Sequence, residues 1–410
     1  MQAVSLLLTF GVIVANSLAM ALPQPNEQGS LVNETIHAIG EEISNLQSGN
    51  LHKRASWTVG IQSIKNSASL GRDFAASARS GGSLYVTFAN QLNGKLQAQP
   101  WNMLWQEGVS DWSQYPLSID GSNNQVDGGV ASVVRSTDRM ESFFGRGNEI
   151  YSYYFVAQNG IGNWFSSSEK KARAAAAGTS ISAVSREPRS MEIFYVGNNG
   201  DLRHSYSNDD GQKWVIDQTL WSGPVNPISL TSITSTRLAQ LAVFWTRPDG
   251  AIWGAWLNGS GWQGKQLLGP GSAHPSSRLT TTTRSELRIN IFYIGNDKKV
   301  HQIYWKSETP GTWNTPSEPI SNLAATPGSL SAVSMNFNHQ EVFFLGSDSK
   351  LKHAYWTEAA KTWKSEALPG ANSACQASGS LGVVSRRDGT MEGWCKATSN
   401  KDLVHFYYYA

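Results

Sequence analysis

An all-β fold, a seven-bladed β-propeller of four-stranded blades, is predicted by three features of the sequence. Tryptophan recurs at intervals of about 50 residues, a period typical of propellers and other repeat folds. Each of the last six recurring tryptophans closes a segment with a strand-like run, a Gly/Asn/Asp turn, a second strand and a polar turn. Glycine (38) and tryptophan (16) are abundant while only 16% of residues are charged, as in all-β chains with many turns. The recurring tryptophans are Trp57, Trp112, Trp164, Trp214, Trp262, Trp313 and Trp363.

The second strand of each repeat is its clearest marker. These runs are aromatic and β-branched, as in MEIFY at residues 191–195, which favours strands buried between neighbouring sheets. A run of small residues precedes each one, as suits the crowded strand beside a propeller axis, and a hairpin turn with a third strand follows. The seven runs are residues 84–88, 140–144, 191–195, 241–245, 289–293, 340–344 and 391–395.

The two ends of the repeat region predict how the ring closes. The seventh unit stops at residues 406–410, after its third strand, and has no tryptophan strand. Residues 56–60 contain Trp57 but follow no other strand of a repeat. We therefore expect this first strand to complete the last blade, because closure removes the free sheet edges that invite aggregation.

Two places depart from the repeat. Residues 166–177 (SSSEKKARAAAA) are charged and then alanine-rich, which predicts a helical insertion between the second and third blades. The first blade carries extra residues before Trp112, among them Trp101 and Trp105. Such departures are where we expect function.

Residues 1–21 have the pattern of a secretory signal peptide. An apolar stretch at residues 4–14 is followed by Ala19-Met20-Ala21, an A-x-A cleavage pattern. This stretch is too short to span a bilayer, and no later one is long enough. We expect a protein of the secretory pathway, secreted and without a membrane span.

Residues 22–54 form a polar leader without aromatic residues. The leader ends in Lys53-Arg54, a dibasic pair of the kind that processing proteases cut. We interpret it as a pro-segment, so that the propeller spans residues 55–410. A disordered leader that stays attached is the alternative.

A secretory route permits two kinds of covalent modification. Asn33 and Asn258 each begin a glycosylation sequon, and the second is expected on an exposed turn. Cys375 and Cys395 could form a disulfide in an oxidising compartment. The predicted hairpin places Cys395 opposite Gly382, so a bridge requires the chain to bend at Cys375. Both outcomes remain open.

Charge and motifs narrow the function classes. A formal net charge of +2 gives no reason to expect nucleic acid or an anionic membrane as partner. The chain has no phosphate-binding loop, nucleophile elbow, dinucleotide fingerprint or metal-ligand spacing, and its eight histidines are scattered. We expect no metal, no cofactor and a small apolar or glycan ligand. The sequence does not predict an oligomeric state.

Glutamate in the second strand and histidine in the third recur together. The pairs are Glu192 with His204, Glu341 with His353 and Glu392 with His405. In the second blade Glu141 is present, and Tyr153 takes the predicted histidine position. The pairs could be general acid–base groups or hydrogen-bonded networks that hold the blades. Their repetition favours the networks, since a single active site would not be copied.

Arginine recurs at the end of the inner strand. On a closed ring these residues would gather around one face, where they could hold a carboxylate, an enolate or a polarised carbonyl. Arg79 and Arg284 lack the second-strand glutamate that could pair with the arginine in blades two, three and seven, which makes them the better functional candidates. The five equivalent positions are Arg79, Arg135, Arg186, Arg284 and Arg386.

Residues 191–204 (MEIFYVGNNGDLRH) resemble the repeats of fucose-lectin-like propellers, and the resemblance covers all seven units. The sugar sites of the fungal members use Arg in the second strand and Glu in the third. Glu192 and His204 occupy those positions here, a version more similar to the seven-bladed bacterial lectins of the superfamily. In other blades the second-strand position holds Tyr85, Ala242 and Asn290.

The overall plan also resembles a group of secreted fungal propellers that act as hetero-Diels–Alderases. The shared features are a signal peptide, about 400 residues, lectin-like blades and the loss of the sugar motif. These enzymes join a tropolone quinone methide to humulene. The resemblance implies a pocket that aligns the two reactants and an Arg, His or Tyr that hydrogen-bonds the tropolone oxygen.

Three function classes therefore remain: a pericyclase, a secreted lectin and a non-catalytic interaction protein. A lectin needs several equivalent shallow sites, whereas an enzyme needs one pocket built by residues that break the repeat. The varied second-strand residues favour the enzyme. The candidate catalytic residues are Arg79, Arg284 and Tyr153, and the candidate substrate-binding residues are Trp101, Trp105, Trp253 and Trp256.

Overall fold

The computed structural model describes part of the 410-residue chain. The described residues are 57–64, 67–80, 82–92, 98–107, 111–117, 126–158, 161–234, 241–370, 375–376, 380–399 and 401–409. Contacts divide the chain into two units, Met1–Ala55 with Ala410 and Ser56–Tyr409, and every described residue belongs to the second. The predicted signal peptide, the leader and Asn33 lie outside the described residues.

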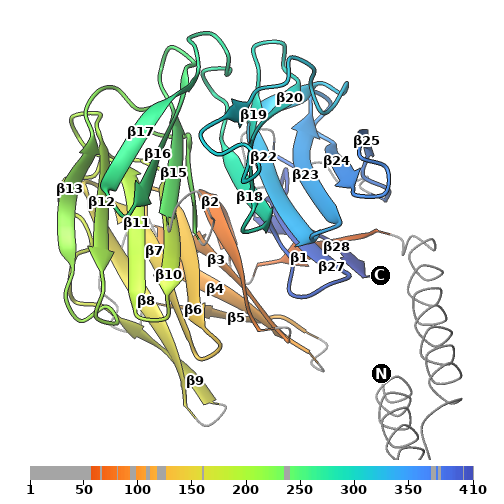
Figure 1. Ribbon diagram of the computed structural model, residues 1–410. Helices are drawn as coiled ribbons and strands as arrows, with labels where there is room; N and C mark the ends of the chain where they lie inside the picture. Colours follow the sequence, from red (N-terminus) through yellow and green to blue (C-terminus); the bar gives the residue numbers. More distant parts are fainter. Residues whose placement is uncertain are drawn as a thin grey trace, which may run out of the picture. The chain divides into compact units, whose positions relative to one another are not determined.

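The described residues form seven antiparallel four-stranded sheets, so the predicted seven-bladed propeller is confirmed (Figure 1). Each sheet is one blade, numbered here in chain order from its first strand.
Blade 1 contains β2 (Ser67–Ser80), β3 (Ser83–Leu92), β4 (Ala98–Gln106) and β5 (Ser113–Pro116). Blade 2 contains β6 (Val130–Ser136), β7 (Arg139–Arg146), β8 (Glu149–Gln158) and β9 (Ile161–Ser166). Blade 3 contains β10 (Ile181–Glu187), β11 (Ser190–Val196), β12 (Leu202–Ser207) and β13 (Val215–Trp221). Blade 4 contains β14 (Leu230–Thr234), β15 (Leu241–Thr246), β16 (Ile252–Asn258) and β17 (Gly261–Leu268).

Three blades complete the ring. Blade 5 contains β18 (Thr280–Ser285), β19 (Arg288–Ile294), β20 (Val300–Lys306) and β21 (Trp313–Asn314). Blade 6 contains β22 (Ala325–Asn336), β23 (His339–Gly346), β24 (Leu351–Thr357) and β25 (Trp363–Ala367). Blade 7 contains β26 (Leu381–Val384), β27 (Thr390–Lys396), β28 (Asp402–Tyr409) and, as its outer strand, β1 (Thr58–Ser63).

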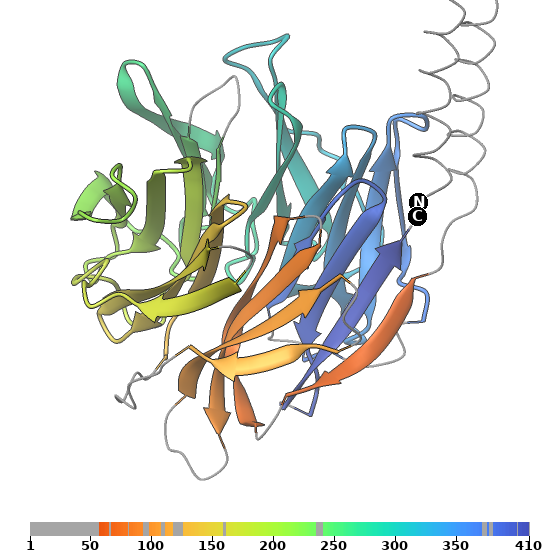
Figure 2. The ribbon, with the colours of Figure 1, turned by 90° about the horizontal axis from the view of Figure 1, so that it is seen from below.

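The ring is closed by contacts between first strands and by the N-terminal strand. Each first strand contacts that of the next blade, and β26 of blade 7 contacts β2 of blade 1. Strand β1 pairs antiparallel with β28, with Val59 opposite Phe406, as predicted from the ends of the repeat region. Figure 2 shows β1 alongside the C-terminal strands. The outer edge of blade 7 is therefore made by the residues nearest the start of the unit.

Hydrophobic packing explains why the second strands are so apolar. The described residues contain seven hydrophobic clusters, one between each pair of neighbouring blades. Each recurring tryptophan, at the outer strand of one blade, packs on an aromatic ring of the preceding blade's second strand. Such aromatic pairs contribute about 0.5–1.5 kcal/mol beyond the area they bury. The pairs are Trp112 with Trp394, Trp164 with Tyr85, Trp214 with Phe143, Trp262 with Phe194, Trp313 with Phe244, Trp363 with Phe292 and Trp57 with Phe343.

Residues 166–177 do not form the predicted helix. After β9 the segment runs extended across the neighbouring sheets, with bridges from Ala172 to Ile150 and from Ala175 to Gly197. Both alanines are buried. Their small side chains fit between blades 2 and 3, so packing outweighs the intrinsic helix propensity of alanine.

Two predicted pairings in the blades were wrong by one residue. Cys395 lies opposite Leu381 and not Gly382, while Cys375 bridges to Ala397 and forms the disulfide with Cys395 at a Cα–Cα distance of 5.9 Å. In blade 2, Ser152 lies opposite Phe143, the position of His204 in blade 3, so Tyr153 does not replace the histidine. The error at Tyr153 arises because the second turn of blade 2 is one residue shorter than that of blade 3. The error at Cys395 arises because the first turn of blade 7 was centred half a residue too late.

Candidate functional site

We call each interface between neighbouring blades a cleft, whether side chains fill it or leave it open. A second-strand side chain and a third-strand side chain of one blade face the tryptophan of the next. Between blades 3 and 4, for example, Glu192 and His204 are hydrogen-bonded and the His204 ring lies 5.8 Å from that of Trp262. The clefts therefore differ mainly in what those positions hold.

The Glu–His pairs form closed networks inside three clefts. His353 Nδ1 lies 2.7 Å from a Glu341 oxygen, and His339 contacts the other oxygen at 2.7 Å. Burial alone would raise the pKa of Glu341, but the hydrogen bonds and charges of the two histidines hold it below its ordinary value. In blade 7, Glu392 contacts His405 at 3.2 Å. This geometry matches the interpretation of hydrogen-bonded networks that hold the blades, because histidine rings are hydrogen-bonded to the glutamate carboxylates.

The cleft between blades 2 and 3 is filled by the chain itself. Lys171, from the extended segment after β9, has a side chain only 2% exposed and an ammonium 4.9 Å from the Trp214 ring. Burial lowers the pKa of Lys171, while burial raises the pKa of Glu141 in the same cleft. Asp210 accepts hydrogen bonds from Arg135 and Arg139 of blade 2. Internal charges thus take the space that a ligand would need.

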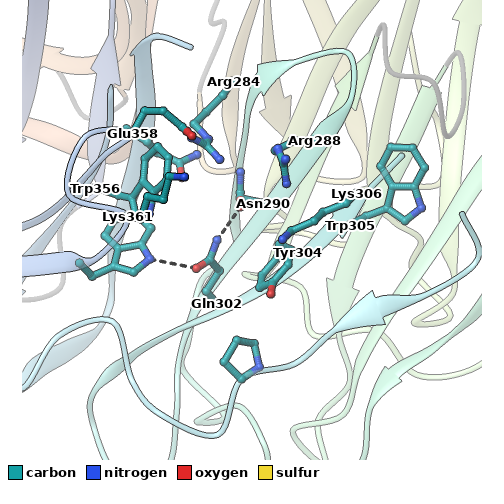
Figure 3. Close-up of a pocket in the computed structure, with 13 residues that line it drawn as sticks. Arg284, Arg288, Asn290, Gln302, Tyr304, Trp305, Lys306, Trp356, Glu358 and Lys361 are labelled. Atoms are coloured by element: carbon teal, nitrogen blue, oxygen red, sulfur yellow. Dashed lines mark hydrogen bonds and ion pairs between the residues drawn. The ribbon is translucent and has the colours of Figure 1, made fainter. Parts of the chain in front are cut away.

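The cleft between blades 5 and 6 is open instead. It contains two adjoining cavities of about 460 and 700 Å³, which share Gln302, Pro316 and Trp363. The first cavity is lined by aromatic rings, amides and four cationic side chains against one carboxylate (Figure 3). The cations are Arg284, Arg288, Lys306 and Lys361, the carboxylate is Glu358, and the aromatic residues are Tyr304, Trp305, Trp356 and Trp363.

Arg284 is the most firmly placed of these cations. Its guanidinium lies 3.7 Å from the Trp356 ring centre, and Nη1 donates to Glu358 at 3.2 Å and to the Phe337 carbonyl at 3.4 Å. Burial lowers the pKa of Arg284, yet an arginine stays charged at any ordinary pH. The cavity therefore holds a fixed positive charge on an aromatic wall.

A chain of hydrogen bonds crosses the floor of the same cavity. Trp363 Nε1 donates to Gln302 Oε1 at 3.1 Å, and Gln302 Nε2 donates to Asn290 Oδ1 at 2.5 Å (Figure 3). Asn290 and Gln302 occupy the positions that Glu and His hold in blades 3, 6 and 7. Neutral amides thus replace the charged pair where the cavity opens.

Local sequence explains why this cleft stays open. The outer strand β21 has only two residues, the shortest strand in the described part of the chain. Pro316 and Pro319 follow it, and proline cannot donate a hydrogen bond to a strand ladder. The outer strand of blade 5 therefore stops pairing after two residues, and Pro316, which follows it, borders both cavities.

Of the predicted catalytic residues, only Arg284 lines this cavity. Arg79 reaches from blade 1 to blade 2, where it donates to the Thr137 carbonyl and lies 4.8 Å from the Phe155 ring. Tyr153 is buried against Phe144 in the cluster between the same two blades. The arginines therefore do not share one site. Arg79 and Tyr153 stay predictions as catalytic residues.

The four predicted substrate-binding tryptophans lie elsewhere. Trp101 is buried between blades 7 and 1, and Trp105 lies beneath the Arg386 guanidinium at 4.4 Å. Trp253 packs 5.5 Å from the Trp221 ring, and Trp256 packs 6.2 Å from that of Trp313. These residues are split between two regions, and neither cavity is lined by them. Asn258 begins the turn after β16, where its side chain accepts a hydrogen bond from the Ser260 backbone at 2.9 Å.

Sequence reasoning missed Gln302, Trp356 and Trp363. Trp363 belongs to the recurring set, whereas function was expected where the repeat is broken. A usable signal was present: Asn290 and Gln302 break the Glu–His pattern in the blade that also carries Pro316 and Pro319.

Two further observations concern metals and membranes. Within the described ranges, no group of three or more His, Cys, Asp or Glu side chains is placed to hold a metal ion. No helix among those residues is long and apolar enough to cross a membrane.

Comparison with solved structures supports the fold. The BP39L lectin from Burkholderia pseudomallei superposes with a TM-score of 0.67 at 17% identity, covering 82% of this chain and 96% of that chain. AofleA from Arthrobotrys oligospora gives 0.52 at 14% identity, covering 76% and 90%. The SapL1 lectin in complex with α-methyl fucoside gives 0.51 at 16% identity, covering 75% and 99%. At these identities the likeness shows the propeller fold alone.

Comparison of sequences identifies the family. No curated protein matches this chain. Residues 157–392, more than half of the chain, match the model of the family described as fungal fucose-specific lectin. The chain therefore belongs to the fungal fucose-specific lectin family.

Proposed function

We propose that this protein acts as a hetero-Diels–Alderase that binds an oxygenated heterodiene in the cleft between blades 5 and 6 and aligns an alkene with it. The observation that carries the proposal is the lining of the first cavity, four cations against one carboxylate among aromatic rings. A tropolone-type quinone methide is flat and concentrates negative charge on its oxygens, so it suits such a lining. A neutral sugar offers the cations no charge to balance.

The reaction needs little chemistry from the protein. The quinone methide forms first, when a hydroxymethyl tropolone loses the hydroxyl of its hydroxymethyl arm and the proton of its ring hydroxyl as water. The cycloaddition itself then forms one C–C and one C–O bond from the π electrons of the heterodiene and the alkene, and no further group leaves. Alignment of two reactants in one cleft can remove about 7–11 kcal/mol of a bimolecular barrier. Arg284 would donate to the heterodiene oxygen, whose negative charge increases as the diene is polarised. Trp356 would hold the flat ring.

A lectin is the second candidate, and family membership favours it. The structure of SapL1 has been solved with α-methyl fucoside. In this protein, the cleft between blades 5 and 6 has a tryptophan on one wall. The amides of Asn290 and Gln302 could hydrogen-bond sugar hydroxyls. Sugar binding without catalysis remains the direct competitor of our proposal.

The deciding experiment gives the purified protein a hydroxymethyl tropolone and humulene. We expect adduct formation faster than the uncatalysed background, with one stereoisomer enriched. No rate gain, together with micromolar binding on an array of fucosylated and methylated sugars, would exclude the enzyme and establish the lectin.

We also propose that the protein is secreted, with a signal peptide at residues 1–21 and a leader at 22–54 that is removed after Arg54. The disulfide between Cys375 and Cys395 fits an oxidising compartment. Mass spectrometry of protein from a secreting host should find Ala55 at the N-terminus and a glycan on Asn258. A secreted chain that keeps residues 22–54 would contradict the processing.

A further inference from the structure

The hydrogen-bond chain below the first cavity has a fixed direction. An indole N–H can only donate, so Trp363 must meet the oxygen of the Gln302 amide. The Gln302 nitrogen is then the end that meets Asn290, and Asn290 must accept with its own oxygen. Figure 3 shows the contact between the labelled Gln302 and Asn290. The direction does not depend on how either amide is drawn, because the tryptophan sets it.

The hydrogen-bond series ends at the side-chain amide of Asn290, whose nitrogen is a donor without a partner among the described residues. Asn290 is 4% exposed, it lines the first cavity, and its Nδ2 has no hydrogen-bond partner among the described residues. A buried amide donor left unpaired is destabilising, because it has lost its hydrogen bonds to water without gaining a partner. Each donation along a chain also polarises the next amide, which makes Asn290 Nδ2 a stronger donor.

Two more unpaired donors line the same cavity. Gln340, on β23 of blade 6, is 1% exposed, and its Nε2 has no partner among the described residues. The Nε of Arg284 is likewise unpaired, although its Nη1 is bound. Three buried donors from two blades thus line one cavity.

We propose that Asn290, Gln340 and Arg284 form a binding subsite for an acceptor-only oxygen group on a flat ring, such as an oxyanion beside a carbonyl. The inference rests on the proposed function and names the part of its substrate that is bound. Such a group accepts several hydrogen bonds and brings no donor that would need an acceptor. It would complete the three unpaired groups and balance the surplus of cations.

Trp363 then has a positioning role. It acts through Gln302 to keep the nitrogen of Asn290 toward the cavity. In the cleft between blades 3 and 4, Trp262 faces Glu192 and His204, and the described residues there form no such series of amide hydrogen bonds. Trp262 therefore provides a matched control for the loss of one indole.

The test measures binding of tropolone, as its anion, to the purified full chain by calorimetry. The neutral comparison is tropolone methyl ether, which keeps the ring and the carbonyl but cannot ionise. We expect the anion to bind more tightly than the ether. Asn290→Ala should weaken anion binding about tenfold and Asn290→Asp about a hundredfold or more, because a charged acceptor then faces the anion. Trp363→Phe should weaken it about tenfold, while Trp262→Phe should not change it.

Three outcomes would overturn the subsite: equal affinity for anion and ether, an unchanged affinity in Asn290→Asp, or equal losses in Trp363→Phe and Trp262→Phe. Thermal melts identify any variant that fails to fold, and Asn290→Ala then decides. Anion binding with this pattern but no cycloadduct would remove the proposed function and leave the subsite. A cycloaddition rate that is unchanged in the Asn290 variants would support the proposed function and contradict the subsite.

Discussion

The cleft between blades 2 and 3 and the cleft between blades 5 and 6 are built from the same positions of the repeat. The first is filled by side chains of the protein, whereas the second is open. In the first, a buried lysine of the chain lies over Trp214 near the Glu141 carboxylate. In the second, cations and amide donors surround a cavity beside Trp363 that no segment of the described residues fills. The comparison shows that the arrangement repeated in every blade contributes stability. The residues that depart from the repeat decide whether a cleft is filled by the chain or open to a ligand.

The charges of the two clefts make the same point. Between blades 2 and 3 the chain supplies the cation that its buried carboxylate needs. Between blades 5 and 6, Arg284 pairs with Glu358 and Arg288 with Glu308, but the cavity is also lined by Lys306 and Lys361, whose charges an anionic ligand would balance. Four predictions test this contrast, in order of expected effect.

Trp214→Ala should reduce the free energy of unfolding by about 4 kcal/mol, whereas Trp363→Ala should reduce it by about half as much. Trp214 is packed by Phe143 and Lys171, while one side of Trp363 already borders a cavity. Denaturant unfolding at neutral pH measures both. Equal losses would mean that the cleft between blades 5 and 6 is not a weaker part of the frame.

Lys171→Met should reduce stability by about 3 kcal/mol at pH 7, because it leaves the buried Glu141 carboxylate without its nearest compensating charge. The folded pKa of Glu141 is already raised by burial, so ionisation in the folded state costs stability as pH rises above the unfolded value of this group. Loss of Lys171 raises that pKa further. The deficit of the variant should therefore grow between about pH 4.5 and pH 7 in urea titrations.

The matched control for this prediction is the double variant Lys171→Met with Glu141→Gln. It has no charge to compensate and should recover most of the stability at pH 7. A pH-independent loss in the single variant would show that Lys171 acts only by filling space.

Arg284→Ala should slow adduct formation about a hundredfold, since it removes the donor to the developing oxyanion. Arg135→Ala removes the equivalent inner-strand arginine from the filled cleft and should not change the rate. Steady-state kinetics with a hydroxymethyl tropolone and humulene provides the comparison. The same loss in both variants would place the reaction outside the cleft between blades 5 and 6.

Pro316→Ala should have the smallest effect. Alanine restores a backbone donor at the edge of blade 5, so the shared wall of the two cavities can approach the sheet. We expect a change in stability below about 1 kcal/mol and a loss of ligand affinity of a few fold. An unchanged affinity would show that the prolines do not keep the cleft open.

Much of the fold could be predicted because the repeats carry it. The aromatic second strands and the tryptophan period predicted seven blades, and the orphan Trp57 predicted the closing strand. The pairing of Tyr153 was missed because a turn shorter by one residue shifts every partner in the strand that follows. The pairing of Cys395 was missed because the sequence does not fix the centre of the hairpin turn before it. The helix predicted at residues 166–177 was wrong because burial between two blades overrides propensity.

The sequence by itself determined the architecture, since a pattern copied seven times reports the same local physics seven times. It also identified Arg284 as an inner-strand arginine whose blade has no glutamate at the second-strand position. Only the tertiary structure decided which cleft is open, because a cavity depends on which side chains of two blades meet across an interface. That Lys171 fills one cleft and that Trp363, Gln302 and Asn290 form a directed chain in another are facts of packing between blades, which no single repeat contains.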